Sequence, residues 1–367
     1  MAQALKDAPR ARTFRARPWR SSRTEARPEP IIVGWVTPTE ALERVVHYLD
    51  RAHETGFKAK AFGRAAEVVR GLPAEEIAER AKSNTLKQLD GIGDSSAKVI
   101  IEALRGDTTY LDKLDRESKV SITAAGQPYR EALKGDCHLH SRWSDGGATI
   151  EAMANTAVAL GHEYMVLTDH SARLTIAHGL DRQRLRDQLA DIDQLNAKLA
   201  PFRILTGMEV DILEDGALDL DDDMLERLDV VVASVHSKLR MDRFPMTQRM
   251  VRAVESPHVD ILGHCTGRLI GKRPESEFDA DKVFTACAAN NTAVEFNSRP
   301  ERLDPPEPLV AIAKAAGCYF SIDSDAHATG QLEWQPHGCD RAAAGGVEIE
   351  RIINTWSAAD LLAWTNS

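Results

Sequence analysis

Histidine and carboxylate residues recur along this chain at the ends of short apolar runs. In the run GDCHLHSRWSDGG, His138 and His140 form a His-x-His pair that is followed by Asp145. Later runs carry the other members of the set, which are His170, Glu209, His236, His264, Asp325 and His327. Imidazole and carboxylate groups together are ligands that suit Zn, Mn or Fe better than Ca or Mg. The pattern therefore predicts a metal centre.

The number of candidate ligands exceeds the four of a structural zinc site, so we expect two or three divalent ions with open positions for water and substrate. Side chains two positions apart on a strand point to the same face, so His138 and His140 project together. A single histidine at a strand end is more often a hydrogen-bonded structural residue, and Asp145 alone is typical of a turn. Six of the twelve histidines lie at the ends of these runs, which favours the metal interpretation.

The elements that must position these residues alternate β-rich runs with longer amphipathic helical patterns. The runs are CHLH, YMVLTDH, FRILTGMEVDI, LDVVVASVH, VDILGHC, TAVEFN and CYFSID. Such alternation predicts an α/β fold with parallel strands and right-handed crossovers. Ligands at the ends of many strands favour a barrel, because barrel active sites lie on the C-terminal face. An open doubly wound sheet is the alternative, but it concentrates its site at one switch point.

The chain divides into four segments by composition. Residues 1–32 are rich in Arg and Pro, which predicts a disordered basic arm; an Arg-rich transit peptide is the rival interpretation. Residues 33–108 show helical periodicity and predict a small all-helical domain. Residues 109–132 are polar and turn-rich and predict a linker. Residues 133–367 hold the strand–helix alternation.

The net charge of −10 is unevenly distributed. Residues 1–30 carry +5 and residues 31–130 are neutral, which leaves −15 for the rest of the chain. An acidic catalytic domain suits cation binding, and we expect any binding of a polynucleotide to depend mainly on the N-terminal part of the chain.

The five cysteines are scattered and form no C-x-x-C pair, which indicates a reducing, cytoplasmic environment. Cys137 and Cys265 are neighbours of candidate ligands, but strand alternation points them away from the metals. No apolar stretch approaches the ~20 residues of a membrane helix. We expect neither a membrane partner nor an obligate protein partner.

The motifs resemble those of the polymerase-and-histidinol-phosphatase (PHP) family of phosphoesterases. Its six motifs match DCHLH, LTDH, GMEVD, SVHSK, GHCTGR and SDAH, in this order, within about residues 133–340. The resemblance implies a distorted seven-stranded (β/α) barrel, a centre of two or three metals (Mn²⁺, Zn²⁺ or Fe) and hydrolysis of phosphate esters. Water activated by the metals would attack phosphorus, so no protein nucleophile is needed.

Further residues are expected to act around the metals. Asp136 and Asp169 are expected to orient ligand histidines. Four cations that follow strands are candidates for holding phosphate oxygens, with a solvated surface charge as the alternative for each; they are Lys238, Arg268, Arg299 and Arg302. Arg268 and Arg302 lie in TGR and RLD strings similar to those of PHP domains fused to family-X DNA polymerases.

The helical domain contains LDGIGDSSAKVI, which matches a helix-hairpin-helix pattern. Gly91 and Gly93 form a turn that leaves backbone N–H groups free at a helix start, where a phosphate oxygen is favoured, and Lys98 adds a contact. The surrounding residues resemble the small N-terminal domain of family-X polymerases, which implies DNA binding through residues 33–108. A structural helical cap is the alternative. Thr37 or Thr39 is expected to cap the first helix of this domain.

The resemblance to family-X polymerases is incomplete. In those enzymes a palm and fingers separate the two domains, whereas only residues 107–132 separate them here, so no polymerase site is expected. The acidic string LDLDDD at 218–223 lies within the predicted barrel and is no substitute. Val99 takes the position that can hold a lyase lysine, so deoxyribose-phosphate lyase activity is not expected by that route.

Three functions follow from these observations. The leading hypothesis is a metal-dependent hydrolase of phosphate esters at DNA ends, acting as a 3′-5′ exonuclease or a 3′-phosphatase in repair. The second is a small-molecule phosphatase of the histidinol-phosphate or nucleoside-bisphosphate type. The third is a DNA-binding protein without activity, which the retention of every candidate ligand disfavours.

Overall fold

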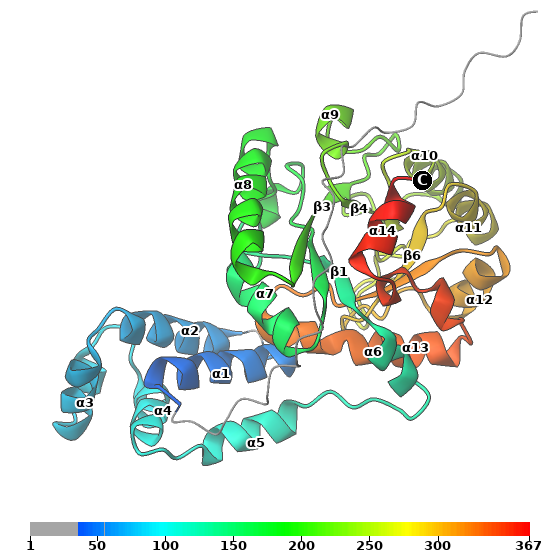
Figure 1. Cartoon of the computed structure of the whole chain (residues 1–367). Helices are drawn as coiled ribbons and strands as arrows, with labels where there is room; N and C mark the ends of the chain where they lie inside the picture. The colour runs from blue at the N-terminus through cyan, green and yellow to red at the C-terminus, as the bar shows by residue number, and fades with distance from the viewer. Residues whose placement is uncertain (1–35, 55) are drawn as a thin grey trace, which may run out of the picture.

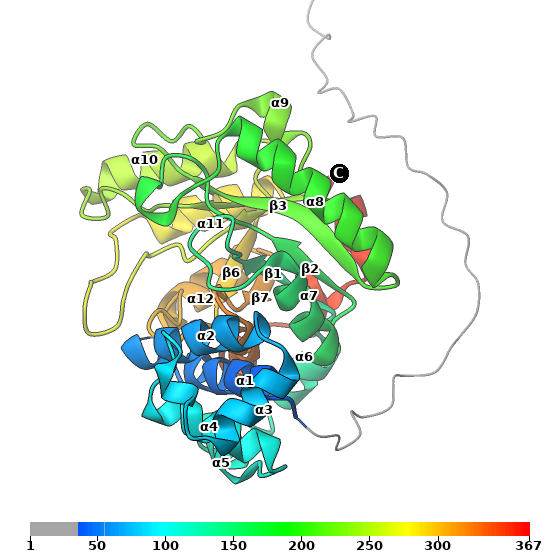
Figure 2. The same ribbon diagram turned by 90° about the vertical axis from the view of Figure 1, so that its left-hand side faces the viewer.

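The computed structural model describes residues 36–54 and 56–367. An all-helical domain precedes an α/β barrel, and the two lie side by side (Figures 1 and 2). The predicted basic arm, residues 1–32, lies outside the described residues. None of the helices in the described ranges is long and apolar enough to cross a membrane.

Amphipathic helices build the N-terminal domain around one apolar core. They are α1 (Pro38–Arg51), α2 (Phe57–Arg70), α3 (Ala74–Lys82), η1 (Leu86–Gln88), α4 (Asp94–Leu104) and α5 (Thr109–Ser118). Thr37 begins α1 in a capping box with Glu40, so Thr37 rather than Thr39 is the cap. Leu42, Val45 and Leu49 lie on one face of α1 and are buried in the core of this domain.

The segment 109–132, which the sequence predicts as a linker, contains two helices, α5 and α6 (Gln127–Ala132). Leu111 of α5 is buried in the helical core, and Leu114 packs beside it. The Tyr129 hydroxyl of α6 donates to the Val347 carbonyl at 2.7 Å. The polar composition makes these helices hard to recognise in the sequence, because each contributes only a narrow apolar stripe to the packing.

Seven parallel strands form the barrel, in the order of the chain. They are β1 (Gly135–Leu139), β2 (Tyr164–Leu167), β3 (Arg203–Asp211), β4 (Val230–Ser234), β5 (Ile261–Leu262), β6 (Ala293–Asn297) and β7 (Phe320–Asp323). Beyond β7, the Asp325 N–H donates to the His138 carbonyl at 3.0 Å, and the His140 N–H donates to the Ala326 carbonyl at 2.8 Å. These bonds bring β7 back to β1. The predicted barrel is confirmed, and the open sheet is excluded.

Helices cover the outside of the barrel (Figure 1). The elements between and after the strands are α7 (Ile150–Ala159), η2 (Thr175–Ala177), α8 (Arg182–Leu199), α9 (Asp222–Leu225), α10 (Arg243–Val254), α11 (Ala280–Ala289), α12 (Glu307–Ala315), η3 (Thr329–Trp334), α13 (Gln335–Ala344), η4 (Ile349–Arg351), η5 (Ile353–Thr355) and α14 (Ala358–Thr365). The strands are almost wholly buried, as parallel strands covered by helices must be.

The helical domain docks on the barrel through α1 and η3. Arg51, whose side chain is only 5% exposed, pairs with Glu333 at 2.7 Å and with Asp115 at 2.6 Å. The Trp334 indole donates to the Arg51 carbonyl at 2.9 Å. A Cβ at Gly330 would lie 1.9 Å from the His47 carbonyl oxygen, so only glycine allows this approach. The contact holds the two domains in a defined orientation.

We predict that Arg51→Ala destabilises the protein by about 3 kcal/mol, because it leaves the Glu333 carboxylate without its main partner in a partly buried position. Denaturant unfolding of the full chain measures this change. Lys113→Ala on α5, which removes an exposed i,i+4 partner of Glu117, is the matched control and should change stability by less than about 0.5 kcal/mol. Equal stability of the two variants would contradict the prediction.

Candidate metal centre

The nine predicted ligands converge at the C-terminal ends of the barrel strands. Each of them lies in one of six strands or in the loop that follows it. His138 lies in β1 and Glu209 in β3. The others follow a strand: His140 and Asp145 follow β1, His170 follows β2, His236 follows β4, His264 follows β5, and Asp325 and His327 follow β7. Three groups of them place ligand atoms within 4.8 Å of one another, and the groups share His140 and His170. One continuous cluster therefore forms.

Glu209 lies at the middle of this cluster. It is buried near the end of β3, and both of its oxygens face imidazole nitrogens. The distances from the Glu209 oxygens to these nitrogens are 3.4 Å for His138, 3.6 Å for His140, 2.9 Å for His170, 3.2 Å for His236 and 2.9 Å for His264. A carboxylate with two such oxygens can bridge two ions.

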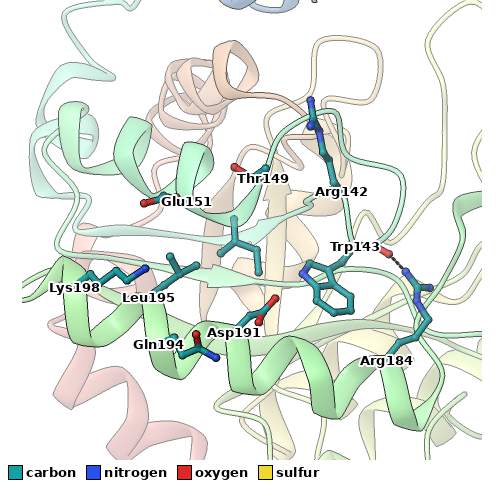
Figure 3. Close-up of a pocket in the computed structure, with 10 residues that line it drawn as sticks. Arg142, Trp143, Thr149, Glu151, Arg184, Asp191, Gln194, Leu195 and Lys198 are labelled. Carbon is teal, nitrogen blue, oxygen red and sulfur yellow. Dashed lines mark hydrogen bonds between the residues drawn. The ribbon is translucent and has the colours of Figure 1, made fainter. Parts of the chain in front are cut away.

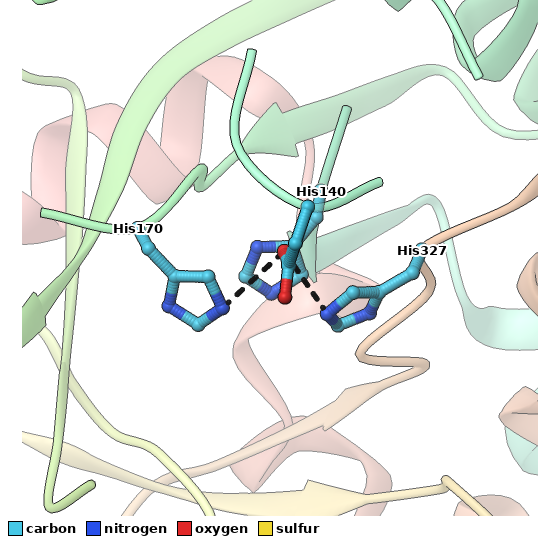
Figure 4. A group of neighbouring side chains, drawn as sticks. His140, His170 and His327 are labelled. Atoms are coloured by element: carbon cyan, nitrogen blue, oxygen red, sulfur yellow. Dashed lines mark ion pairs between the residues drawn. The ribbon is translucent and has the colours of Figure 1, made fainter. Parts of the chain in front are cut away.

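Asp145 organises a second part of the cluster. The imidazoles of His140, His170 and His327 gather around one carboxylate in Figure 4. Asp145 Oδ1 lies 3.5 Å from His170 Nε2 and 3.4 Å from His327 Nε2. Asp325 contributes a third carboxylate, 3.4 Å from His140 Nε2. The cluster thus has three carboxylates among its imidazoles.

Many polar atoms of the cluster are buried without a hydrogen-bond partner in the described part of the chain. They are both ring nitrogens of His140, both oxygens of Glu209, His138 Nε2, His170 Nδ1, His236 Nε2 and His264 Nδ1. Unpaired buried polar atoms are rare in proteins, and bound ions are one cause of such a concentration. These donors therefore fit divalent metal ions.

The protonation states of His140 and Glu209 also suit metal binding. Burial lowers the pKa of His140 to about 3, with the neighbouring His327 and His170 adding to the effect, so this imidazole is neutral near pH 7. Burial alone would raise the pKa of Glu209, but the charges of His236 and His138 hold it well below its usual range. Neutral imidazole and ionised carboxylate are the forms that bind metals.

Two carboxylates that the sequence analysis missed orient ligand histidines. Glu295 in β6 accepts from His138 Nδ1 at 2.6 Å and from the His264 backbone N–H at 2.5 Å. Asp211 lies 3.1 Å from His236 Nδ1. Both anions favour a proton on Nδ1 and so leave Nε2 free for a metal. A charged residue inside the apolar run TAVEFN was the available signal for Glu295.

Asp136 and Asp169, which were expected to orient histidines, contact no imidazole within hydrogen-bonding distance among the described residues. Asp169 accepts from the hydroxyls of Ser141 and Ser144 at 2.6 and 2.5 Å. Asp136 accepts from the backbone N–H of His138 at 3.2 Å. The two aspartates therefore hold the backbone of the ligand-bearing loops instead of the rings.

The four predicted phosphate-binding cations have different environments. Arg302 Nε lies 3.1 Å from Asp325 Oδ2, and its Nη1 is buried with no partner in the described ranges. Arg299 Nη1 lies 3.2 Å from His327 Nδ1. Both guanidinium groups therefore reach the metal cluster.

Lys238 and Arg268 differ from this pair. Lys238 is exposed just after His236, in a left-handed backbone conformation, and forms no ion pair within the described chain. Arg268 donates to the carbonyl oxygens of Arg302 and Leu303 and pairs with Glu275 at 3.0 Å. The contacts of Arg268 support the loop after β6, so its role in phosphate binding stays a prediction.

The glycine turn of the helical domain lies between η1 and α4. Gly91 has a φ of +93°, which favours glycine. The Gly93 N–H donates to Ser96 Oγ at 2.9 Å, so this N–H is not free to bind a ligand. The N–H groups of Asp94 and Ser95 lie in the first turn of α4, where the described chain offers them no helical partner. The Lys98 side chain is 72% exposed and lies 3.7 Å from Glu102.

A groove separate from the metal centre lies between α7 and α8 (Figure 3). Trp143 and Arg142, from the loop that also carries Asp145, line one end of it. None of the nine candidate ligands lines the groove, so it does not extend the metal cluster.

Comparison with known families agrees with this architecture. A model described as PHP domain matches residues 136–299, and a model described as helix-hairpin-helix domain matches residues 37–109. The chain thus contains a PHP domain preceded by a helix-hairpin-helix domain. Only residues 110–135 lie between the two matches, so no polymerase palm separates them.

Two kinds of protein, a polymerase/exonuclease and a probable phosphatase, are similar to this chain. A DNA polymerase/3′-5′ exonuclease PolX of Bacillus subtilis (strain 168) is 41% identical over 232 residues, which are 63% of this chain and 41% of that protein. The match thus spans less than half of the polymerase. A probable phosphatase of Thermoanaerobacter sp. (strain X514) is 28% identical over 232 residues, which are 60% of this chain and 89% of the phosphatase.

A solved structure is also similar. The crystal structure of histidinol phosphate phosphatase from Lactococcus lactis subsp. lactis, with zinc, L-histidinol and phosphate, superposes with a TM-score of 0.44 at 17% sequence identity. The match covers 57% of this chain and 94% of that chain.

We predict that removing bound metal with a chelator lowers the melting temperature by about 5–10 °C, because ligands that bind only the folded state stabilise it. Calorimetry before and after dialysis against EDTA measures the shift, and adding Mn²⁺ or Zn²⁺ should restore it. His138→Ala should show a smaller response to the metal. An unchanged melting temperature in the wild type would contradict the prediction.

We predict that Glu295→Gln weakens metal affinity by about tenfold, because the neutral amide polarises His138 Nδ1 less strongly than a carboxylate does. Competition with a chromogenic chelator measures the affinity. Glu255→Gln, at the C-terminal end of α10, is a matched control that should leave it unchanged. Identical affinities for Glu295→Gln and the control would contradict the prediction.

Proposed function

We propose that this protein is a metal-dependent phosphoesterase that hydrolyses phosphate esters at DNA ends, as a 3′-5′ exonuclease or a 3′-phosphatase. The observation that carries the proposal is the buried cluster of imidazoles and carboxylates, many of whose polar atoms have no hydrogen-bond partner in the described chain, together with a helix-hairpin-helix domain in the same chain. The similarity to an exonuclease over 63% of the chain supports it.

Two or three divalent ions, Mn²⁺, Zn²⁺ or Fe, would be held by the nine ligands, with Glu209 as the shared carboxylate. When bound, such ions supply an activated water and neutralise charge on phosphate oxygens. The chain itself contributes cations beside this cluster. Arg302 contacts Asp325, Arg299 lies beside His327, and Lys238 is exposed two residues after His236. These three cations can bind the phosphate oxygens of the substrate that do not react.

The helical domain would hold the DNA backbone. The N–H groups of Asp94 and Ser95, which have no helical partner in the described chain, lie at the start of α4, and Lys98 lies on the same helix. Such a helix start attracts a phosphate oxygen without reading base sequence. The neutral net charge of this part of the chain is more favourable for DNA than the acidic barrel.

An activity screen tests the proposal. Mn²⁺-loaded protein is incubated with end-labelled DNA that carries a 3′-hydroxyl or a 3′-phosphate in a gap, and His138→Ala serves as the blank. We expect release of nucleotides or of phosphate by the wild type only. If neither DNA substrate is changed while a small phosphate ester is hydrolysed, the proposal of a DNA substrate is wrong.

We predict that Lys98→Ala weakens DNA binding and lowers the slope of log affinity against log salt by about 0.9, because one phosphate contact is lost. Titration of a labelled gapped duplex at several salt concentrations measures the slope. Lys113→Ala is the matched control, because it also removes one exposed lysine, on α5, and it should leave the slope unchanged. Equal slopes for all three proteins would contradict a role for Lys98.

A small-molecule phosphatase is the second candidate. The specific observation in its favour is the match to probable phosphatases, of which the chain covers 89% in one case. Histidinol phosphate and a nucleoside bisphosphate are the substrates to test. If either one is turned over with a kcat/KM well above that for DNA ends, this function replaces the first.

A further inference from the structure

The end of α1 reaches the metal centre through a chain of polar contacts. His53, in the turn directly after α1, contacts Glu301 with its Nε2. The other Glu301 oxygen accepts from Arg299 Nε at 2.9 Å. Arg299 Nη1 then lies 3.4 Å from the Asp325 carbonyl oxygen and 3.2 Å from His327 Nδ1. A residue of the helical domain is thus two side chains away from candidate metal ligands.

The hydrogen bonds of this chain have a defined direction. Glu301 only accepts, so His53 Nε2 and Arg299 Nε are both donors to it. His327 Nδ1 lies 2.9 Å from the Asp325 carbonyl, which also only accepts, so Nδ1 carries the proton and Nε2 is left for a metal. Arg299 Nη1 is therefore a second donor at the same carbonyl.

The guanidinium of Arg299 is held through Nε and Nη1. Glu301 binds Nε, and the buried Trp334 ring lies 5.9 Å from the guanidinium carbon. His53 packs edge-on against the same ring at 5.6 Å. Nη2 of Arg299 donates to no residue of the described chain, so it is available to a substrate oxygen beside the metal ligands.

The pKa of Glu301 supports this arrangement. Hydrogen bonding from His53, together with the Arg299 charge, lowers it to about 2, so the carboxylate is ionised at any working pH. An ionised carboxylate fixes a guanidinium more firmly than a neutral acceptor does. The Glu301 side chain is 19% exposed and that of His53 is 33% exposed, so solvent competes only in part.

We propose that His53 and Glu301 are positioning residues that aim Arg299 at the substrate phosphate, so that the helical domain takes part in phosphate binding at the metal centre as well as in holding DNA. The inference rests on the proposed phosphoesterase function. It implies that even a substrate too small to reach the glycine turn depends on the helical domain. A module that only binds DNA would have no such effect.

The test uses the full-length, Mn²⁺-loaded protein with two probes, p-nitrophenyl phosphate and inorganic phosphate. For His53→Ala we expect KM for the ester and the dissociation constant of phosphate to rise about fivefold to tenfold, with kcat changed less than twofold. Loss of a contact made equally in the ground state and the transition state has this signature. Calorimetry gives the phosphate affinity independently of turnover.

Two further variants separate positioning from folding. His53→Gln retains a side-chain N–H donor and should recover most of the phosphate affinity. Glu301→Gln keeps the volume of the side chain but loses the charge, and should raise KM as His53→Ala does. Lys113→Ala is the control on the same domain and should match the wild type.

The outcomes are distinct. Phosphate affinity and KM within twofold of the wild type in both His53→Ala and Glu301→Gln would overturn the positioning role. A fall in bound Mn²⁺ in these variants, measured by elemental analysis, would also overturn it, because the residues would then act on metal retention. Absence of any phosphoesterase turnover in the wild type would overturn the proposed function instead, and the calorimetric comparison would still test the positioning role.

Discussion

The structure depends on one carboxylate that is buried among imidazoles at the C-terminal face of the barrel. Glu209 is buried near the end of β3 and faces five imidazoles, and neither of its oxygens has a hydrogen-bond partner in the described chain. Leaving such a group buried costs several kcal/mol unless cations compensate it. The cluster is therefore a site that is complete only with metal ions, and the barrel around it must hold the ligands in place without them.

Carboxylates outside the ligand set supply that support. Glu295 holds His138, Asp211 holds His236, and Asp169 fixes the serines of the loop after β1. Each of these anions lies on a different strand or strand end from the group that it supports. The barrel thus ties its neighbouring strands together through polar side chains at the C-terminal face, while apolar packing stabilises the rest.

The helical domain is attached to the barrel beside this face. Arg51 and Trp334 form the firm part of the contact, and the pair of His53 and Glu301 extends it towards Arg299. The domain proposed to bind DNA and the centre proposed to act on phosphate esters are therefore physically continuous. This continuity is the structural reason to treat the two domains as one functional unit.

The sequence alone determined the ligand types, the strand–helix alternation and the glycine turn, because these are local patterns of spacing and composition. It did not reveal Glu295 as the partner of His138, which lies 157 positions earlier in the chain, nor the engagement of Arg268 with backbone carbonyls. It also assigned α5 to a linker. These features depend on which strands and helices become neighbours when the barrel closes and the domains dock, and only the tertiary structure decides that. Side-chain hydrogen bonds act over a few ångströms of space, whatever the separation along the chain.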